Sequence, residues 1–333
     1  MEFNKKIAVL GGGSWATAIV KILTENLETV NWWMRDKDCA NHIMKFKHNP
    51  RYIQAIEFDV NRLNISTNIQ EIVDDSDILI VAIPSPYLAK AFEEMDVVGI
   101  DKKFIISATK GVVPAETNRI PARFFHKEFN VPYNKIGMIA GPCHAEEVAM
   151  ERLSYLTMAC EDQEIATYLA EAMSCRYINT TTSDDLFGTE LSAILKNVYA
   201  VASGICHGLG YGDNFQAVLI SAATRETQEF IDAVHPIHRD VKSSAYLGDL
   251  LVTAYSQFSR NRNFGSMVGK GYSVRSAQIE MNMVAEGYYA AKGIYEINKK
   301  FNVDIPIVDA VYNILYEKIS PIMEMRLLAG KLT

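Results

Sequence analysis

The sequence predicts an α/β protein in which a doubly wound parallel sheet is followed by an all-helical C-terminal domain. Three observations support this fold class: short apolar runs alternate with helical patterns in the first half, a glycine-rich turn follows the first run, and long helical patterns fill the second half. Most of the apolar runs are nearly continuous, which is typical of strands covered by helices on both faces.

The expected strands occupy residues 6–10, 28–34, 77–83, 103–108, 136–140, 155–160 and 176–181, with helical patterns between them, for example over 14–25 and 163–173. Such repetition predicts right-handed crossovers between parallel strands. From Leu186 onward no convincing strand appears. The expected helices of this second half lie at residues 186–207, 214–234, 281–299 and 307–318. We therefore expect two domains, formed by residues 1–185 and 186–333.

Composition excludes several classes of protein. With 333 residues, 49% of them hydrophobic and 22% charged, the chain fits a globular protein rather than a disordered or fibrous one. A net charge of −7 repels nucleic acid and anionic membrane, and no apolar run is long enough to span a bilayer. The five cysteines are scattered and never spaced as CxxC, and no leader segment precedes the first strand. We therefore expect a cytoplasmic protein with reduced thiols and no metal site.

The glycine-rich turn fits the dinucleotide-binding fingerprint G-x-G-x-x-G/A. Gly11 allows a tight turn, Gly13 lets the backbone approach a pyrophosphate, and Ala16 is small enough for the next helix to pack close to the strand. The N–H groups that begin this helix would face the phosphates. A strand precedes the turn, and a second strand comes about 20 residues later. The first domain is therefore predicted to be Rossmann-like and to bind NAD or NADP.

The end of the second strand bears on the choice between these two cofactors. An acidic residue there binds the ribose 2′-hydroxyl of NAD, whereas an arginine accommodates the 2′-phosphate of NADP. This sequence has Arg35 followed by Asp36, so the preference stays open, although Arg35 favours tolerance of NADP.

Three later strands end in residues that suit a ligand site. Ligands bind outside the carboxyl ends of parallel strands, so we expect these loops to line the cofactor site. The loops contain Pro84-Ser85, Lys110-Gly111 and Gly141-Pro142. The alternative for Lys110 is a solvated lysine on a loop.

The first predicted helix of the second domain carries a single lysine on a face of small residues. Its broad apolar face consists of Leu191, Ile194, Leu195, Val198 and Ala202. Nearly opposite lie Thr189, Ala193, Lys196, Ala200 and Ser203. Small neighbours allow another element or a ligand to approach, and a lysine held there loses solvation, which lowers its pKa toward the range useful for proton transfer. The alternative is a lysine that extends to the surface.

A second polar cluster follows, in Leu247-Gly248-Asp249-Leu250 and in the segment SRNRNFG at 259–265. Arg260 can bind a phosphate with two parallel hydrogen bonds, with Asn261 and backbone N–H groups completing the site. Asp249 can orient Lys196 or bind a substrate hydroxyl. By itself this segment would be an ordinary polar loop.

Other candidates are weaker. His235 and His238 are metal-ligand types, but Pro236 breaks the helix that would turn both the same way. Cys143 beside His144 offers a nucleophile and a base, yet adjacent side chains rarely point together. An apolar stripe, interpreted as core or as the contact of a homodimer, consists of Val311, Ile314, Leu315 and Ile319.

Taken together, the motifs resemble those of bacterial-type NAD(P)-dependent glycerol-3-phosphate dehydrogenases. The matching segments, in the family's order, are GGGSWATA (11–18), ATKG (108–111), GPCHAEE (141–147), GTELSAILKN (188–197), LGDL (247–250), SRNRNFG (259–265) and VAEG (284–287). They span nearly the whole chain, so they are far more specific than the nucleotide turn alone.

By this resemblance, Lys196 is expected to donate and accept the proton. The residues expected to bind substrate are Lys110, Gly141, Asp249, Ser259, Arg260 and Asn261. The residues expected to contact the cofactor are Gly11, Gly13, Ser14, Trp15, Ala16, Arg35, Lys110, Ala145, Arg260, Val284 and Glu286. The sequence departs from the family's pattern at Ala16 (commonly Gly), at Cys143-His144 (usually Ser/Thr-Phe) and at Ser192 (usually Gly).

The resemblance implies reversible hydride transfer between NAD(P)H and dihydroxyacetone phosphate, giving sn-glycerol 3-phosphate for phospholipid synthesis. Two rival functions are a two-domain dehydrogenase for a hydroxy acid or sugar acid, and a non-catalytic NAD(P)-sensing protein. A sensor has no need of an acid–base lysine, which argues against the second rival.

Overall fold

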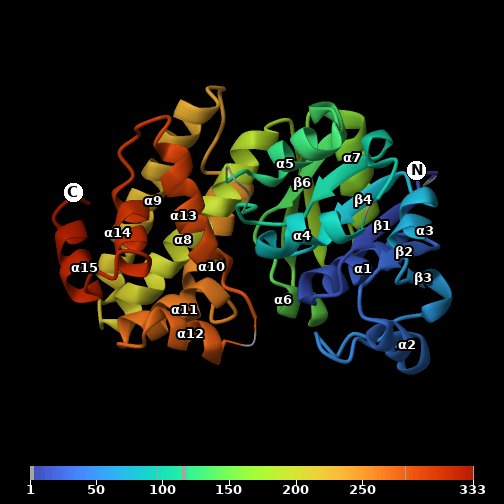
Figure 1. Ribbon diagram of the computed structural model, residues 1–333, viewed down its shortest axis with the longest axis horizontal. Helices are drawn as coiled ribbons and strands as arrows, with labels where there is room; N and C mark the ends of the chain where they lie inside the picture. Colours follow the sequence, from blue (N-terminus) through green and yellow to red (C-terminus); the bar gives the residue numbers. More distant parts are fainter. Residues whose placement is uncertain (1–3, 96, 115–117, 282, 333) are drawn as a thin grey trace. The chain divides into compact units, whose positions relative to one another are not determined.

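The computed structural model describes all residues except 1–3, 96, 115–117, 282 and 333, and it divides into two compact units. Unit 1 comprises Met1–Ile83, Tyr87–Thr109 and Pro121–Leu186. Unit 2 comprises Pro84–Pro86, Lys110–Ile120 and Phe187–Thr333. Two short segments of the first half therefore belong to the second unit, and one of them carries Lys110. Figure 1 shows the elements in chain order.

Unit 1 is built on one eight-stranded sheet with the order β3-β2-β1-β4-β5-β6-β7-β8. The strands are β1 (Ile7–Leu10), β2 (Val30–Trp33), β3 (Leu63–Ser66), β4 (Ile78–Val81), β5 (Phe104–Ser107), β6 (Ile136–Ala140), β7 (Ser154–Cys160) and β8 (Ile178–Ser183). All neighbouring pairs are parallel except β6 and β7. Each of the seven predicted runs overlaps a strand, whereas β3 was not predicted.

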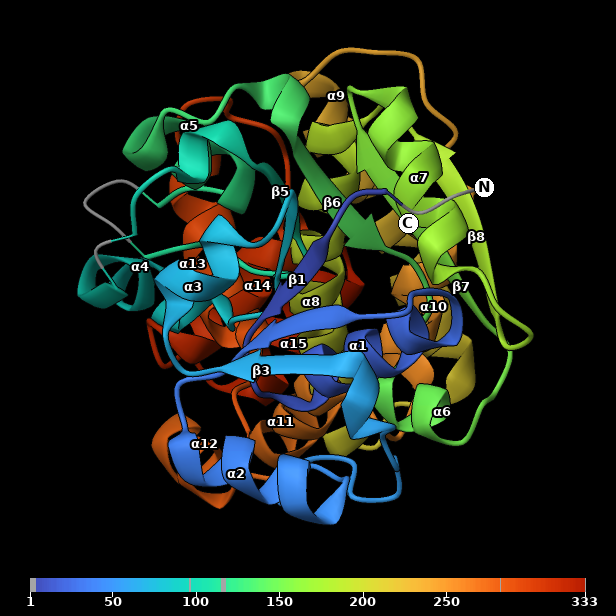
Figure 2. The ribbon, with the colours of Figure 1, turned by 90° about the vertical axis from the view of Figure 1, so that its right-hand side faces the viewer.

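The helices of unit 1 cover both faces of this sheet (Figure 2). They are α1 (Ser14–Asn26), α2 (Lys37–Phe46), α3 (Ile69–Asp74), α4 (Ser85–Met95), α5 (Pro121–Phe129), α6 (Ala145–Ala149) and α7 (Gln163–Met173). Short 3₁₀ turns lie at Val60–Arg62, Ile100–Lys102 and Tyr133–Lys135. Figure 2 shows α1, α6 and α7 on one face and α3, α4 and α5 on the other. Strands β1 and β4 are completely buried between these layers, as their continuous apolar sequences predict.

The nucleotide turn has the conformation that its glycines predict. Gly11 has a φ of 133°, and a Cβ atom there would lie 2.7 Å from the carbonyl oxygen of Ala82 on the neighbouring strand end. Only glycine fits this position. The indole of Trp32 donates a 2.7 Å hydrogen bond to the carbonyl of Gly11, which fixes the turn against β2.

The described part of unit 2 consists mainly of helices joined by loops, with one isolated β-bridge between Val113 and Arg119. Its helices are α8 (Leu186–Gly208), α9 (Asp213–Val234), a π-helical turn (Ser244–Gly248), α10 (Asp249–Tyr255), α11 (Arg260–Gly269), α12 (Val274–Glu280), α13 (Glu286–Asn298), α14 (Pro306–Leu315) and α15 (Pro321–Ala329). The predicted fold class is thus confirmed. Helix α8 is buried on all sides from residue 188 to residue 206, so its face of small residues is covered by protein.

Glycines bring α8 and α11 into backbone contact. A Cβ atom at Gly204 of α8 would lie 2.0 Å from the carbonyl oxygen of Arg262, and one at Gly265 of α11 would lie 2.1 Å from that of Val201. Neither position has room for a side chain. This contact fixes the start of α11, and with it the SRNRNFG segment, against the helix that carries Lys196.

Candidate active site

Lys196, Asp249 and Lys110 meet inside unit 2. The Lys196 ammonium group contacts Oδ1 of Asp249, and the Lys110 ammonium group lies 3.5 Å from Oδ2 of the same carboxylate. Lys196 is 5% exposed and Asp249 1% exposed. Three residues that the sequence singled out separately, from a loop, α8 and the start of α10, thus form one charged cluster.

The surroundings of Lys196 lower its pKa. Burial is the largest cause, because it disfavours the charged ammonium form. The carboxylate of Asp249 opposes this effect, and the positive charge of Lys110 adds to it. The result is a pKa of about 7 for Lys196, so this amine can give up or take a proton near neutral pH.

A chain of amide hydrogen bonds positions this cluster. The side chain of Asn197 donates to the carbonyl of Lys110 (2.6 Å) and accepts from the amide of Asn261 (2.8 Å). Asn261 in turn accepts from the N–H of Gly287 (2.9 Å). The Lys110 loop, α8, α11 and α13 are joined in this way. Sequence reasoning did not select Asn197, although its place beside Lys196 on a buried helix was a usable signal.

The start of α10 holds Asp249 in place. The π-helical turn runs directly into α10, because Gly248 already has helical dihedral angles. One turn later, the Thr253 hydroxyl donates to the carbonyl of Asp249 (2.6 Å). Thr253 is buried one helical turn from the carboxylate and was also missed by sequence reasoning.

The segment SRNRNFG forms the beginning of α11 rather than a loop. The hydroxyl of Ser259 accepts from the N–H of Arg262 and caps the helix. Arg260 is exposed, and its guanidinium lies 3.8 Å from the sulfur of Met283. It has no ion-pair partner among the described residues, so its donors are available to an anion.

Glu286 and Ser85 make a second contact within unit 2. The N–H of Ser85 donates to the carboxylate of Glu286 (2.9 Å). A Cβ atom at Gly111, next to Lys110, would lie 2.1 Å from the Ser85 hydroxyl oxygen. The loop residues Pro84–Pro86 and Lys110–Gly111 are therefore packed tightly together. Val284, two residues before Glu286, is half-buried.

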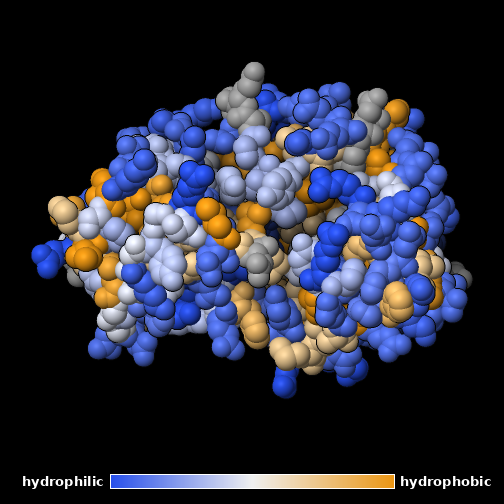
Figure 3. Space-filling model, turned by 60° about the horizontal axis from the view of Figure 1, so that its bottom comes forward, coloured by the Kyte–Doolittle hydropathy of each residue, from blue (hydrophilic) through white to orange (hydrophobic). Residues whose placement is uncertain are grey.

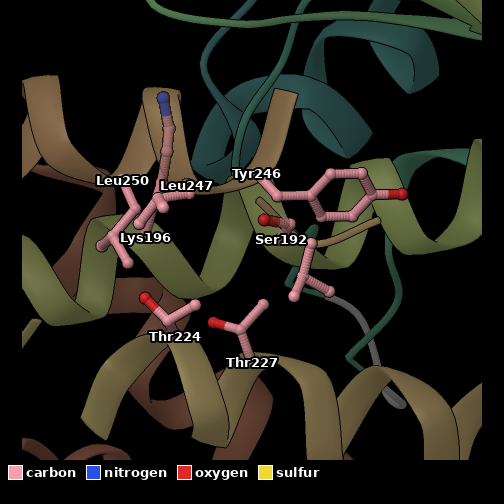
Figure 4. Close-up of a pocket in the computed structure, with 8 residues that line it drawn as sticks. Ser192, Lys196, Thr224, Thr227, Tyr246, Leu247 and Leu250 are labelled. Carbon is pink, nitrogen blue, oxygen red and sulfur yellow. The ribbon is translucent and has the colours of Figure 1, made fainter. Parts of the chain in front are cut away.

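A small pocket lies along the side chain of Lys196. Its lining residues are Ser192, Lys196, Thr224, Thr227, Val241, Tyr246, Leu247 and Leu250. Figure 4 shows the aliphatic stem of Lys196 beside the pocket, with the nitrogen pointing away from Thr224 and Thr227. Ser192, one of the departures from the family's pattern, therefore faces this pocket rather than the ammonium group.

In unit 1, the start of α1 is open toward an anion. Gly13 is the N-terminal cap residue, no side chain caps the helix, and its first turn has no acidic residue. Ser14 and Ala16 are buried, whereas Trp15 is partly exposed. The carbonyl of Gly12 accepts from the side chain of Asn49 (3.1 Å), a residue that the sequence did not single out.

The two residues at the end of β2 have different surroundings. Asp36 accepts from the N–H groups of Asp38 and Cys39, and so caps α2; the Cys39 N–H is the largest cause that lowers its pKa. Arg51 pairs with the second carboxylate oxygen of Asp36 at 2.5 Å. Arg35 is exposed. The carboxylate of Asp36 is thus occupied by contacts within the protein, whereas the exposed side chain of Arg35 is available to a ligand.

Two other predicted ligand residues lie near the end of β6. Gly141 has a φ of 112°, and a Cβ atom there would lie 2.5 Å from the carbonyl oxygen of Tyr155. Ala145 is the buried first residue of α6, which His144 precedes as cap residue. Cys143 is buried.

The described residues hold no cluster of three or more His, Cys, Asp or Glu side chains suited to a metal ion. The ring of His235 packs against Phe187, with centroids 5.2 Å apart. No helix in the described part of the chain has the length and apolar character needed to cross a membrane.

Comparison with known proteins places both halves of the chain in one family. Residues 6–166 match the family model for the N-terminus of NAD-dependent glycerol-3-phosphate dehydrogenase, and residues 185–326 match the model for its C-terminus. The glycerol-3-phosphate dehydrogenase [NAD(P)+] of Staphylococcus carnosus is 31% identical over 98% of both chains. That of Staphylococcus haemolyticus is 33% identical over 94% of both. The crystal structure of a glycerol-3-phosphate dehydrogenase from Coxiella burnetii superimposes with a TM-score of 0.89 at 26% identity, covering 98% of this chain and 99% of the other.

Proposed function

The chain belongs to the NAD-dependent glycerol-3-phosphate dehydrogenase family, and from this premise we propose how its own residues carry out the reaction. It is an oxidoreductase that uses NAD or NADP and interconverts dihydroxyacetone phosphate and sn-glycerol 3-phosphate. The proposal concerns the roles of individual residues, of the two domains, and of the chain in the cell.

The residues of the nucleotide turn fit a dinucleotide. The N–H groups that begin α1 are free of side-chain caps, and a Cβ atom at Gly13 would meet no atom within 4 Å, so a pyrophosphate can approach the backbone there. Gly11, Gly13, Ser14, Trp15 and Ala16 would hold it. The bound cofactor supplies or accepts the hydride. Beyond the turn, the proposed contacts are Arg35, Lys110, Ala145, Arg260, Val284 and Glu286.

Lys196 is the proposed acid and base. In the reducing direction its ammonium group gives a proton to the C2 oxygen of dihydroxyacetone phosphate as the hydride reaches C2; in the oxidising direction the neutral amine takes the hydroxyl proton back. The single observation that carries this role is the buried contact of Lys196 with Asp249, together with its pKa of about 7. Asp249 orients the amine, and Lys110 adds positive charge toward the developing oxyanion.

The phosphate of the substrate is assigned to the start of α11. Arg260 is exposed and has a planar set of donors that matches phosphate oxygens. The capped N-terminus of the helix, at Ser259, adds a favourable dipole. Asn261 is held by Asn197 and Gly287, which keeps this end of α11 at a fixed distance from Lys196. Gly141 would complete the substrate site.

The decisive experiment replaces Lys196 by Ala. We expect the rate of NAD(P)H oxidation with dihydroxyacetone phosphate to fall at least about a hundredfold, because the acid–base group is lost. Binding of NADPH, followed by fluorescence, should stay nearly unchanged. Lys300→Ala, at an exposed lysine of the same unit, is the matched control and should keep full activity. Full activity of Lys196→Ala would refute the assignment.

Substrate tests separate the rival functions. Oxidation of NADPH with dihydroxyacetone phosphate but not with dihydroxyacetone would support the phosphate role of Arg260. Turnover of a hydroxy acid or sugar acid, with none of the phosphate ester, would favour the first rival. Tight cofactor binding without turnover of any substrate would favour a sensor.

We further propose that the chain forms a homodimer through α15. Its outer side exposes Ile322 (62%), Met323 (63%) and Leu327 (62%), with Ile319 close by in sequence. Hydrophobic atoms gather accordingly at the left edge of Figure 3, the end at which α15 lies in Figure 1. Neighbouring exposed apolar side chains of this kind are found at protein–protein contacts. Of the predicted stripe, Val311, Ile314 and Leu315 are core residues. Light scattering after size exclusion, repeated with Leu327→Glu, would test this.

A cytoplasmic location and a role in supplying glycerol 3-phosphate for phospholipid synthesis complete the proposal. All five cysteines are free thiols, four of them buried, which suits a reducing compartment. Fractionation of cells with a specific antibody would test the location.

A further inference from the structure

Two histidine rings face one another on the surface of unit 1. His42 lies on α2, and His48 follows two residues after the end of that helix. Their Nε2 atoms are 3.2 Å apart, and the ring centroids are 4.9 Å apart with an angle of 82° between the planes. Neither the active site nor the nucleotide turn includes this pair.

The second nitrogen of His48 fixes its tautomer. Nδ1 of His48 lies 2.9 Å from the carbonyl oxygen of Phe46, which can only accept a hydrogen bond. Neutral His48 therefore carries its proton on Nδ1 and presents a lone pair on Nε2, toward His42. Metal-binding histidines commonly have this arrangement, in which a carbonyl holds the nitrogen remote from the metal.

The geometry of the pair fits a bound metal ion. Zinc lies 2.0–2.1 Å from a histidine nitrogen. An ion at this distance from both Nε2 atoms, 3.2 Å apart, would subtend an angle of about 103°, close to tetrahedral. If it lay on the axis of each ring, the centroids would be about 5.0 Å apart, against the observed 4.9 Å. A straight N–H···N bond along both axes would instead separate the centroids by about 5.5 Å.

We propose that His42 and His48 bind a divalent transition-metal ion such as Zn²⁺. The described residues contribute no third His, Cys, Asp or Glu ligand, so water completes the coordination. Binding is then weaker than at four-ligand structural zinc sites. The sequence predicted no metal site, because a helix end separates two histidines that are six positions apart.

The site is connected to the nucleotide turn through the residue after His48. Asn49 is completely buried and donates to the carbonyl of Gly12 (3.1 Å) and to the hydroxyl of Thr17 (2.9 Å). A metal ion bound to both histidines would hold His48 against α2. It would therefore also hold the adjacent Asn49 in the conformation in which its side chain bonds to the nucleotide turn. Zn²⁺ is therefore expected to increase the affinity for NADPH.

Calorimetric titration with ZnCl₂ alone tests the site itself and requires no assumption about the reaction. We expect one ion per chain in the unmodified protein and at least tenfold weaker binding in His42→Ala and in His48→Ala. His207→Ala, at an exposed histidine of unit 2, is the matched control and should bind zinc as the unmodified protein does. Unchanged binding in either of the first two variants would overturn the proposal.

The connection is tested by measuring the dissociation constant of NADPH with and without Zn²⁺. We expect zinc to tighten NADPH binding about fivefold, and NADPH to tighten zinc binding by the same factor. In His42→Ala the affinity for NADPH without zinc should be unchanged, and zinc should have no effect. Equal NADPH affinity with and without zinc, in protein shown to bind the ion, would refute the connection. Because this readout is binding, it is independent of whether Lys196 is the acid–base group.

Discussion

The pKa of Lys196 predicts opposite pH dependences for the two directions of the reaction. Reduction requires the ammonium form, and oxidation requires the neutral amine. With a pKa of about 7, the ammonium fraction falls from about ten-elevenths at pH 6 to about one-eleventh at pH 8. The rate of reduction should therefore fall roughly tenfold over this interval, and the rate of oxidation should rise by a similar factor. A solvated lysine, with a pKa near 10.4, would stay almost fully protonated there and leave the rate of reduction unchanged.

The assay follows NADPH absorbance at fixed, saturating cofactor, with kcat/KM for dihydroxyacetone phosphate and for glycerol 3-phosphate measured from pH 5.5 to 9. The substrates themselves titrate, since phosphate monoesters have a second pKa near 6. That ionisation changes both directions in the same sense, whereas Lys196 changes them in opposite senses. Measuring both directions therefore separates the two effects.

Substitution of Asp249 by Asn provides a second test of whether the pKa of Lys196 determines the pH profile of reduction. The carboxylate raises the pKa of Lys196, while burial and Lys110 lower it. Asn should move the inflection of the reduction profile to lower pH and decrease the maximal rate. An unchanged inflection in Asp249→Asn, or profiles with no inflection between pH 6 and 8 in the unmodified protein, would refute the reasoning.

Three further predictions concern other parts of the chain. Burial raises the pKa of Glu226 to about 8, above its ordinary 4.5, so this group makes the folded state less stable as pH rises from about 4.5 to 8. The melting temperature should therefore fall between pH 5 and pH 8 by more in the unmodified protein than in Glu226→Gln, and an equal fall in both proteins would contradict this. Gly265→Ala should destabilise by about 1–3 kcal/mol, because its Cβ would lie 2.1 Å from the carbonyl oxygen of Val201; chemical denaturation measures this, and an unchanged midpoint would count against the backbone contact. Gly11→Ala should lose NADPH binding while circular dichroism stays unchanged, because φ is 133° there; normal NADPH affinity would disprove the role of the turn.

The fold could be predicted where burial on both faces dictates the sequence. Strands such as β4, with the sequence ILIV, were predictable because only apolar side chains fit between two layers of helices. Strand β3 was missed because it lies at the edge of the sheet, pairs only with β2, and has the more polar sequence LNIS. The direction of β7 could not be predicted either. The connection from β6 contains only the five-residue helix α6, and β7 pairs with β6 antiparallel.

The candidate site was predictable to the extent that each residue stood out in its own segment. Lys196 stood out as the one charge on a face of small residues, and burial of that face removes the solvent that an ordinary lysine retains. Asn197 did not stand out, because an amide gains its importance from partners that the sequence does not bring together: the Lys110 carbonyl and Asn261 lie 87 and 64 positions away. The same argument applies to Asn49 beside the nucleotide turn. Charged groups that react were visible in the sequence, whereas the neutral groups that hold them became identifiable only when folding placed their partners within hydrogen-bonding distance.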